Sequence, residues 1–147
     1  MNQINNFMTN LYKKIIFTLF LQLCLSEGFN MQLLSHLPYE IECSDITGFA
    51  QDGREFAVIG LQNSSSFVDV TDPYNPFEIS RISGSISIWR DLKYWNRHVY
   101  IGTEANDGIK IVSVDDPDNP ILVNTIDADG LIDNSHNIHV DLDGYLY

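Results

Sequence analysis

Short apolar segments alternate with polar turns along most of the chain. The segments are rich in β-branched and aromatic residues, as in 56–59 (FAVI) and 99–101 (VYI), and a glycine follows each. This pattern predicts short β-strands. No stretch after Leu34 places apolar residues at helical spacing over three turns. We therefore predict an all-β fold.

One ten-residue segment recurs with a shift of 44 residues. The run FVDVTDPYNP at 67–76 returns as IVSVDDPDNP at 111–120, with six identical positions. Both contain Asp-Pro-x-Asn-Pro, whose prolines lack amide donors and whose Asp and Asn bond the backbone locally, so it predicts a tight connection between strands. Units of about 44–46 residues carrying several short strands have the size of a four-stranded β-propeller blade. The competing architecture is a β-solenoid, whose usual coils are shorter.

A second correspondence marks where each unit begins. Residues 44–46, 90–92 and 136–138 fall at a regular shift of 46, each with Asp or Asn followed by a branched aliphatic residue. Asp-Gly pairs at 52–53 and 143–144 predict turns. We expect two units and the start of a third, which make an incomplete ring, because closed propellers take four to eight blades. The chain is then the N-terminal part of a longer propeller; the alternative is a free-standing fragment with an exposed edge.

The first 28 residues have the organisation of a secretory signal peptide. Lys13 and Lys14 precede an apolar run at 15–25, which is shorter than the about 20 residues of a membrane-spanning helix. Small residues near its end predict cleavage after Gly28; the alternatives are an uncleaved anchor and a lipid on Cys24. We expect residues 1–28 to be a signal peptide, 29–40 an N-terminal lead-in, and 41–147 the propeller portion. The protein is then secreted.

Charge and cysteine content narrow the class of partner. The chain has 8 basic and 20 acidic residues, a net charge of -12. This acidic balance argues against nucleic acid and anionic membrane surfaces as partners, because both need a cationic footprint. After signal removal Cys43 stands alone, which indicates either an unseen partner thiol or a buried one. Asn63 heads the only N-glycosylation sequon, Asn-Ser-Ser, and we expect it to be glycosylated on a surface loop.

The repeated runs resemble the LVIVD repeat, in which an aliphatic strand precedes Asp-Pro-x-Asn-Pro. Together with four further segments they resemble the choice-of-anchor B family: CSDITG (43–48), GREFAVIGL (53–61), SIWRDLK (87–93) and SHNIHVD (135–141). The resemblance covers nearly all of residues 41–147. It implies a secreted or surface-displayed β-propeller with no established catalytic activity and with a variable C-terminal anchor.

The starts of the units supply the candidate ligand-binding residues. The innermost strand of each blade lies beside the central channel, so equivalent positions form a ring there. Asp45, Asp91 and Asn137 then share one ring, with Arg90 and His136 beside them. Carboxylates, a guanidinium, an imidazole and an amide at one channel mouth suit a polar ligand or a cation. The alternative is that Asp and Asn bond neighbouring backbone groups and tie blade to blade.

Neither a catalytic nor a metal site is predicted. His136 and His139, three apart in a strand, point to opposite faces and would not share an ion. The sequence has no nucleophile elbow and no phosphate-binding loop. No cofactor is expected except, as one option, calcium at Asp127, Asp129 and Asp133. Those residues lack the glycine and glutamate of an EF-hand, and the alternative is a solvated turn.

Together these features predict a binding or display module without catalytic activity. Its partners are a protein or glycan at the cell surface and the remaining blades of its own chain; no membrane span is expected in the mature protein. The alternative is a secreted, hydrolase-like enzyme whose site is completed by further blades. Trp89 and Trp95 are expected to be packing residues, with Trp89 beside Arg90 as an alternative stacking surface.

Overall fold

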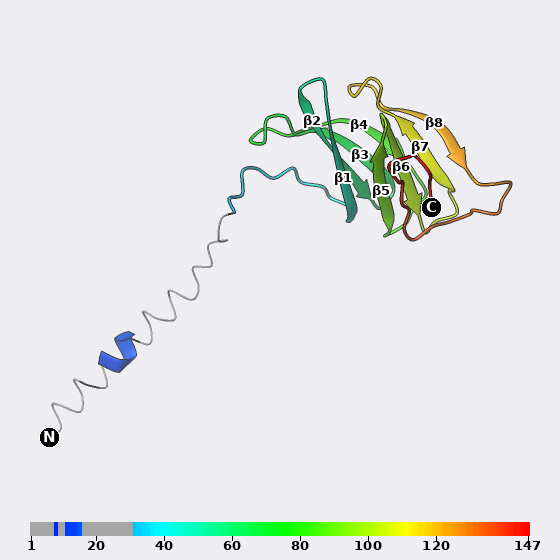
Figure 1. Ribbon diagram of the computed structural model, residues 1–147. Coiled ribbons are helices and arrows are strands. Elements are labelled where there is room, and N and C mark those ends of the chain that lie inside the picture. Colours follow the sequence, from blue (N-terminus) through cyan, green and yellow to red (C-terminus); the bar gives the residue numbers. More distant parts are fainter. Residues whose placement is uncertain (1–7, 9–10, 16–30) are drawn as a thin grey trace. The chain divides into compact units, whose positions relative to one another are not determined.

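Two four-stranded antiparallel β-sheets dominate the protein in a computed structural model, which describes residues 8, 11–15 and 31–147 (Figure 1). Sheet 1 comprises β1 (Cys43–Gln51), β2 (Arg54–Leu61), β3 (Ser64–Asp69) and β4 (Phe77–Ser83). Sheet 2 comprises β5 (Arg90–Trp95), β6 (His98–Thr103), β7 (Ile109–Ser113) and β8 (Ile121–Ile126). Neighbours in each sheet follow chain order. The prediction of an all-β fold is confirmed in part: the described residues are mostly β, in two antiparallel four-stranded sheets, and they form no closed ring.

The chain divides into two compact parts. The first is Met1–Leu33, and the second, Leu34–Tyr147, contains both sheets. Residues 8 and 11–15 are helical. Within the described part, no helix has the length and apolar character needed to cross a membrane. Most of the predicted signal peptide, its cleavage position and Cys24 lie outside the described residues.

The predicted turns connect the strands. Asp52 and Gly53 have φ values of 52° and 79°, which gives a two-residue hairpin between β1 and β2. The corresponding hairpin of sheet 2 uses Asn96 and Arg97, with φ values of 45° and 60°. The sequence did not indicate this second turn, because arginine rarely adopts positive φ.

The two Asp-Pro-x-Asn-Pro segments form the same turn. Asp72 accepts hydrogen bonds from the Tyr74 amide at Oδ1 (3.0 Å) and from the Asn75 amide at its carbonyl (3.0 Å). Asp116 makes the equivalent bonds with the amides of Asp118 (3.1 Å) and Asn119 (3.0 Å). Each segment therefore joins the third strand of its sheet to the fourth, as the proline pattern predicts.

The hydrophobic core lies between the two sheets. Phe49 stacks on Phe56 of the neighbouring strand, with ring centroids 5.0 Å apart, and on Tyr94 of sheet 2, at 4.7 Å. The other buried members of this cluster are Val58 and Phe67 from sheet 1 and Leu92, Val99, Ile101, Val112 and Val114 from the second repeat unit. The two sheets are thus two layers that share one core.

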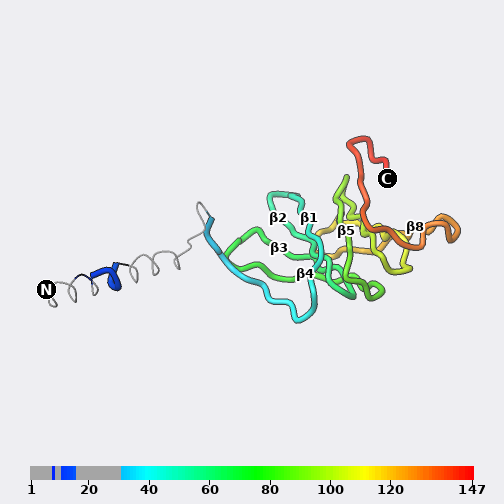
Figure 2. Tube along the Cα trace, turned by 90° about the horizontal axis from the view of Figure 1, so that it is seen from below, coloured from blue at the N-terminus to red at the C-terminus, as the bar shows by residue number. Residues whose placement is uncertain are grey.

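Residues 135–147 lie against sheet 2. The Ser135 amide donates to the carbonyl of Thr103 (2.8 Å), and Trp95 Nε1 donates to the carbonyl of Leu142 (3.4 Å). Val140 and Leu146 form an isolated antiparallel bridge, so this segment turns back on itself. Figure 2 shows it in red, beyond β8 in the chain.

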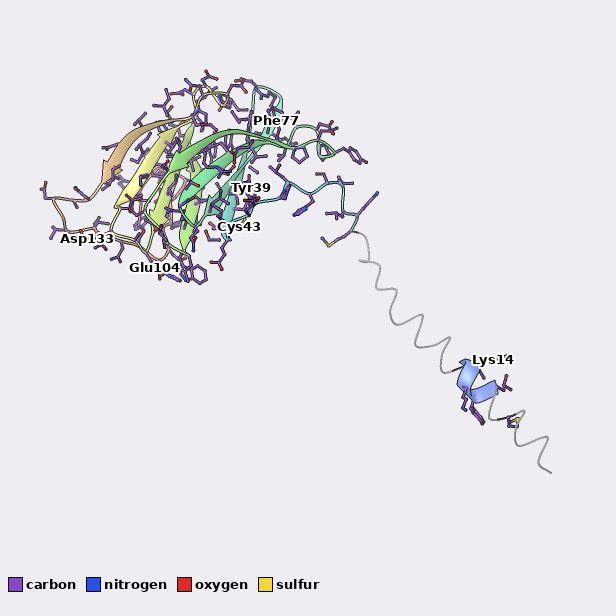
Figure 3. The ribbon with its side chains drawn as sticks, turned by 180° about the vertical axis from the view of Figure 1, so that it is seen from behind. Lys14, Tyr39, Cys43, Phe77, Glu104 and Asp133 are labelled. Atoms are coloured by element: carbon purple, nitrogen blue, oxygen red, sulfur yellow. The ribbon has the colours of Figure 1, made fainter. Side chains whose placement is uncertain are left out.

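The lead-in before β1 contacts sheet 1. The Tyr39 hydroxyl and Ser66 Oγ are 2.8 Å apart, and the Arg81 guanidinium lies 5.7 Å from the centroid of the Tyr39 ring. Figure 3 shows Tyr39 beside Cys43, where β1 begins. Cys43 is exposed and free of any disulfide within the described residues.

Candidate functional site

One cavity brings the candidate ligand-binding residues together. It has a volume of about 140 Å³ and is lined by Ser44, Asp45, Trp89, Arg90, Asp91, His136 and Asn137. These residues come from the three equivalent segments, where β1 and β5 begin and where the chain passes sheet 2 again. All five residues predicted from the unit starts therefore share one cavity.

Two of the aspartates connect successive units. Asp45 Oδ2 accepts a hydrogen bond from the Leu92 amide (2.9 Å), and Asp91 Oδ2 accepts one from the Ile138 amide (2.6 Å). In both cases the donor lies 47 residues further along the chain. These bonds tie each unit to the next. They correspond to the alternative given above, in which the aspartates bond neighbouring backbone groups rather than a ligand.

Lys93 lies between the two carboxylates. Its Nζ donates to Asp91 Oδ1 and is 3.7 Å from Asp45 Oδ2. Burial opposes ionisation of Asp91, but the Ile138 amide and Lys93 outweigh it and hold the pKa of this carboxyl below its ordinary value. Asp91 is therefore a carboxylate at neutral pH, with its charge compensated inside the protein.

The guanidinium of Arg90 is used by the fold. Arg90 is 2% exposed and donates to the carbonyls of Leu61 (2.7 Å), Gln62 (3.3 Å) and Ser85. Burial lowers its pKa from the ordinary value. A Cβ on Gly84 would lie 2.7 Å from Arg90 Nη1, so only glycine leaves room there. Arg90 lines the cavity, but its Nε and Nη2 donate to backbone carbonyls outside it.

His136 forms a pair that the sequence did not predict. Glu104, the residue after β6 (Figure 3), accepts a hydrogen bond at Oε1 from His136 Nδ1 over 2.6 Å. Because a carboxylate only accepts, Nδ1 carries a proton, and Nε2 is an acceptor as long as the ring is neutral. The two residues are 32 apart in the chain, in different repeat units, and no local pattern links them.

Trp89 and Asn137 complete the cavity wall. Trp89 is 48% exposed, and its ring centroid lies 5.2 Å from that of His136. The expectation that Trp89 is a packing residue is wrong, whereas Trp95 packs on the turn at Leu142–Gly144. The exposed carboxamide of Asn137 makes no hydrogen bond to any other described residue. It therefore differs from Asp45 and Asp91, which both act as ties.

The acidic loop proposed for calcium borders a second cavity of about 300 Å³. Its lining residues are Asn106, Asp107, Gly108, Thr125, Asp127, Ile132 and Asp133. Asp107 is paired with Lys110, and Asp127 Oδ1 accepts from the Asp129 amide (3.1 Å), as in a local turn. Among the described residues, no three His, Cys, Asp or Glu side chains are placed to hold a metal ion. Calcium at this loop stays a prediction.

The predicted glycosylation site is on the surface. Asn63 is exposed in the two-residue turn between β2 and β3. Its Oδ1 accepts from Ser64 Oγ (3.0 Å), and its amide nitrogen, the atom that would carry a glycan, has no partner in the described part of the chain. The turn therefore leaves this nitrogen accessible.

Comparison with known proteins returned no relative. No protein-family model matches the chain, nor does any curated protein or any solved structure. The function therefore has to be inferred from the site itself.

Proposed function

We propose that this protein is an extracellular binding module, built from β-propeller blades of the choice-of-anchor B type, whose ligand contacts the cavity at the unit starts. Asp45, Arg90, Asp91, His136 and Asn137 are its proposed lining residues. The observation that carries the proposal is that all five line one cavity, while Asp45 and Asp91 also tie each unit to the next. The cavity lies between the units that these ties join.

The way in which the sheets pack supports a propeller. The packed face of sheet 1 carries Phe49, and the packed face of sheet 2 carries Leu92. The two units are related by a shift of 46 residues. At this shift Phe49 of sheet 1 corresponds to Trp95 of sheet 2, and Leu92 of sheet 2 corresponds to Ile46 of sheet 1. Trp95 lies on the far face of sheet 2, and Ile46 is 64% exposed on the far face of sheet 1. The face of sheet 1 that packs on sheet 2 is therefore not equivalent to the face of sheet 2 that packs on sheet 1. Such a head-to-tail contact, when repeated, generates rings or open helical stacks.

Binding fits the residues better than catalysis does. Asp45, Asp91 and Arg90 bond backbone groups, so most charged groups of the cavity hold the fold together. One observation favours the alternative, a secreted hydrolase: Glu104 orients His136 with Nε2 as an acceptor, as a general base requires. No serine or cysteine nucleophile is seen bonded to that nitrogen among the described residues.

The sequence supports an extracellular location and an extracellular partner. Residues 1–28 have signal-peptide character, and Asn63 is in an exposed turn. The resemblance to the choice-of-anchor B family points to the same compartment. The proposed partner is a protein or a glycan at the cell surface.

The location is tested by expressing the full chain in insect cells. We expect it in the medium with Phe29 as its first residue and with a mass that falls when N-linked glycans are removed. The same treatment should leave Asn63→Gln unchanged. A chain retained in the cytosol, or secreted with residues 1–28 still attached, would contradict the predicted signal peptide.

Binding is tested with the secreted chain on arrays of immobilised glycans and of extracellular protein domains. We expect saturable binding to one class, weakened by Asn137→Ala, a change that removes no hydrogen bond of the described fold. A cooperatively folded chain that binds neither class would refute the binding module. Turnover of chromogenic esters or glycosides that is lost in His136→Gln would establish the hydrolase instead.

A further inference from the structure

The groups that the fold leaves unused define what the cavity can recognise. Asn137 offers a carboxamide that both donates and accepts, and His136 offers Nε2 as an acceptor. Asp45, with a side chain 38% exposed, uses Oδ2 for the Leu92 amide. Trp89 presents a half-exposed indole with an N–H donor. Donors and acceptors are thus mixed beside an aromatic face.

The charge in the cavity does not call for a cation. Lys93 is bonded to Asp91 and lies 3.7 Å from Asp45, and Arg90 lines the same cavity, so two cationic side chains balance the two carboxylates. An incoming ammonium ion would have to compete with this lysine, whose position is fixed by its own strand. A neutral ligand has no such competitor, since it leaves the ion pairs in place.

Trp89 gives the cavity its apolar side. The loop between β4 and β5 also exposes Ile86 (76%) and Ile88 (59%), neither of which lines the cavity. A half-exposed indole suits the C–H face of a pyranose ring, while hydroxyls, which both donate and accept, suit the mixed polar groups. The volume of about 140 Å³ lies below the about 300–1,000 Å³ of ordinary small-molecule pockets. One sugar ring would therefore be held only in part, as at the end of a chain.

We propose that this cavity binds the terminal neutral sugar of a glycan, with Trp89 as the stacking surface and with Asn137 and His136 bonding its hydroxyls. This rests on the proposed binding function and names the ligand class of that same site. The Glu104–His136 pair fixes the orientation of the imidazole. Two of these side chains come from the third unit and Trp89 from the loop before β5, so both units must be in place for binding.

The experiment titrates the full chain with a panel of methyl glycosides of neutral hexoses and N-acetylhexosamines, followed by tryptophan fluorescence and calorimetry. We expect saturable binding of at least one glycoside at millimolar concentration, weakened about tenfold or more in Trp89→Ala. Asn137→Ala should weaken it as well. The matched control is Trp95→Phe, whose indole contacts Leu142 outside the cavity and which should leave the affinity unchanged. Circular dichroism confirms that each variant is folded.

Three results would overturn the sugar assignment. The first is no saturable signal from the folded chain up to about 50 mM of any glycoside. The second is glycoside binding that Trp89→Ala leaves unchanged. The third is tighter binding of propylammonium than of every glycoside, which would assign the cavity to a cation. If the first result is found and the chain binds protein domains on the array, the sugar assignment fails while the proposed binding function stands.

Discussion

Asp45 and Asp91 show how one residue type serves the fold and the site at once. Each uses one carboxylate oxygen for an amide of the next unit, and each also lines the cavity. Asp72 and Asp116, by contrast, cap turns within their own connections. The sequence identified all four aspartates as repeated positions. Which role each plays depends on whether an amide from another unit comes within reach, and that is set by tertiary packing.

The tie between units can be tested by removing its acceptor. Asp91→Ala leaves the amide of Ile138, a buried residue, without its partner, and we expect a loss of about 1–3 kcal/mol in the free energy of unfolding. Asp45→Ala should act in the same direction. Urea unfolding measures both. Asp133→Ala, at an exposed side chain with no hydrogen bond to other described residues, is the control and should stay near wild type. Equal stability of all three variants would contradict the tie.

The charge of Asp91 predicts a pH dependence. Its pKa in the folded protein lies below the ordinary value, so its contribution to stability is fully present above the unfolded-state pKa of about 3.9 and is lost as pH falls through the folded value. Asp91→Asn retains an acceptor for Ile138 but cannot pair with Lys93. The stability difference between wild type and this variant should therefore be largest near about pH 7 and shrink toward about pH 3. A difference that is constant with pH would argue against the ion pair.

At the scale of elements, local chemistry determined what could be predicted. Four-stranded units, the Asp-Gly hairpin at 52–53 and the Asp-Pro turns follow from φ preferences and prolines, which act within a few residues. The start of the third unit, 136–138, matches the repeat in sequence but forms no strand. The Glu104–His136 pair was missed because it depends on how two separate segments cross. Trp89 is half exposed, whereas its neighbour Arg90 takes the buried position.

Close packing at the start of β5 predicts a coupling between glycine and serine. A Cβ on Gly60 would lie 2.6 Å from Ser44 Oγ and 3.0 Å from Arg90 Cβ, so Gly60→Ala should destabilise the protein by about 1–3 kcal/mol. Ser44→Gly removes the nearer atom, though it also removes the bond to the Arg90 amide (3.2 Å). The double variant should therefore be more stable than the sum of the single changes implies, as measured by urea unfolding. Strict additivity would show that the two residues do not clash.

At the scale of the molecule, the two sheets are joined at both ends of their strands. The aspartate tie lies where β1 and β5 begin. At the opposite end, Arg54 bonds Asp69 of its own sheet (2.6 Å) and Asp118 of the second repeat unit (2.8 Å). Asp118 and Asp69 raise the pKa of Arg54. Polar contacts at both ends with an apolar core between them fix one packing of the two sheets.

The outer strand of sheet 2 predicts self-association. β8 ends its sheet, contains no charged residue, and exposes Ile121 (53%), Leu122 (41%) and Val123 (53%); the equivalent strand β4 carries Glu78 and Arg81. An uncharged apolar edge pairs readily with another chain. Sedimentation velocity should therefore show oligomers that grow with concentration. Val123→Lys should suppress them, because a lysine at the edge opposes pairing, whereas Leu131→Lys adds the same charge in a loop and should not. A chain that remains monomeric as its concentration rises, or equal effects of the two lysines, would show that this edge does not drive association.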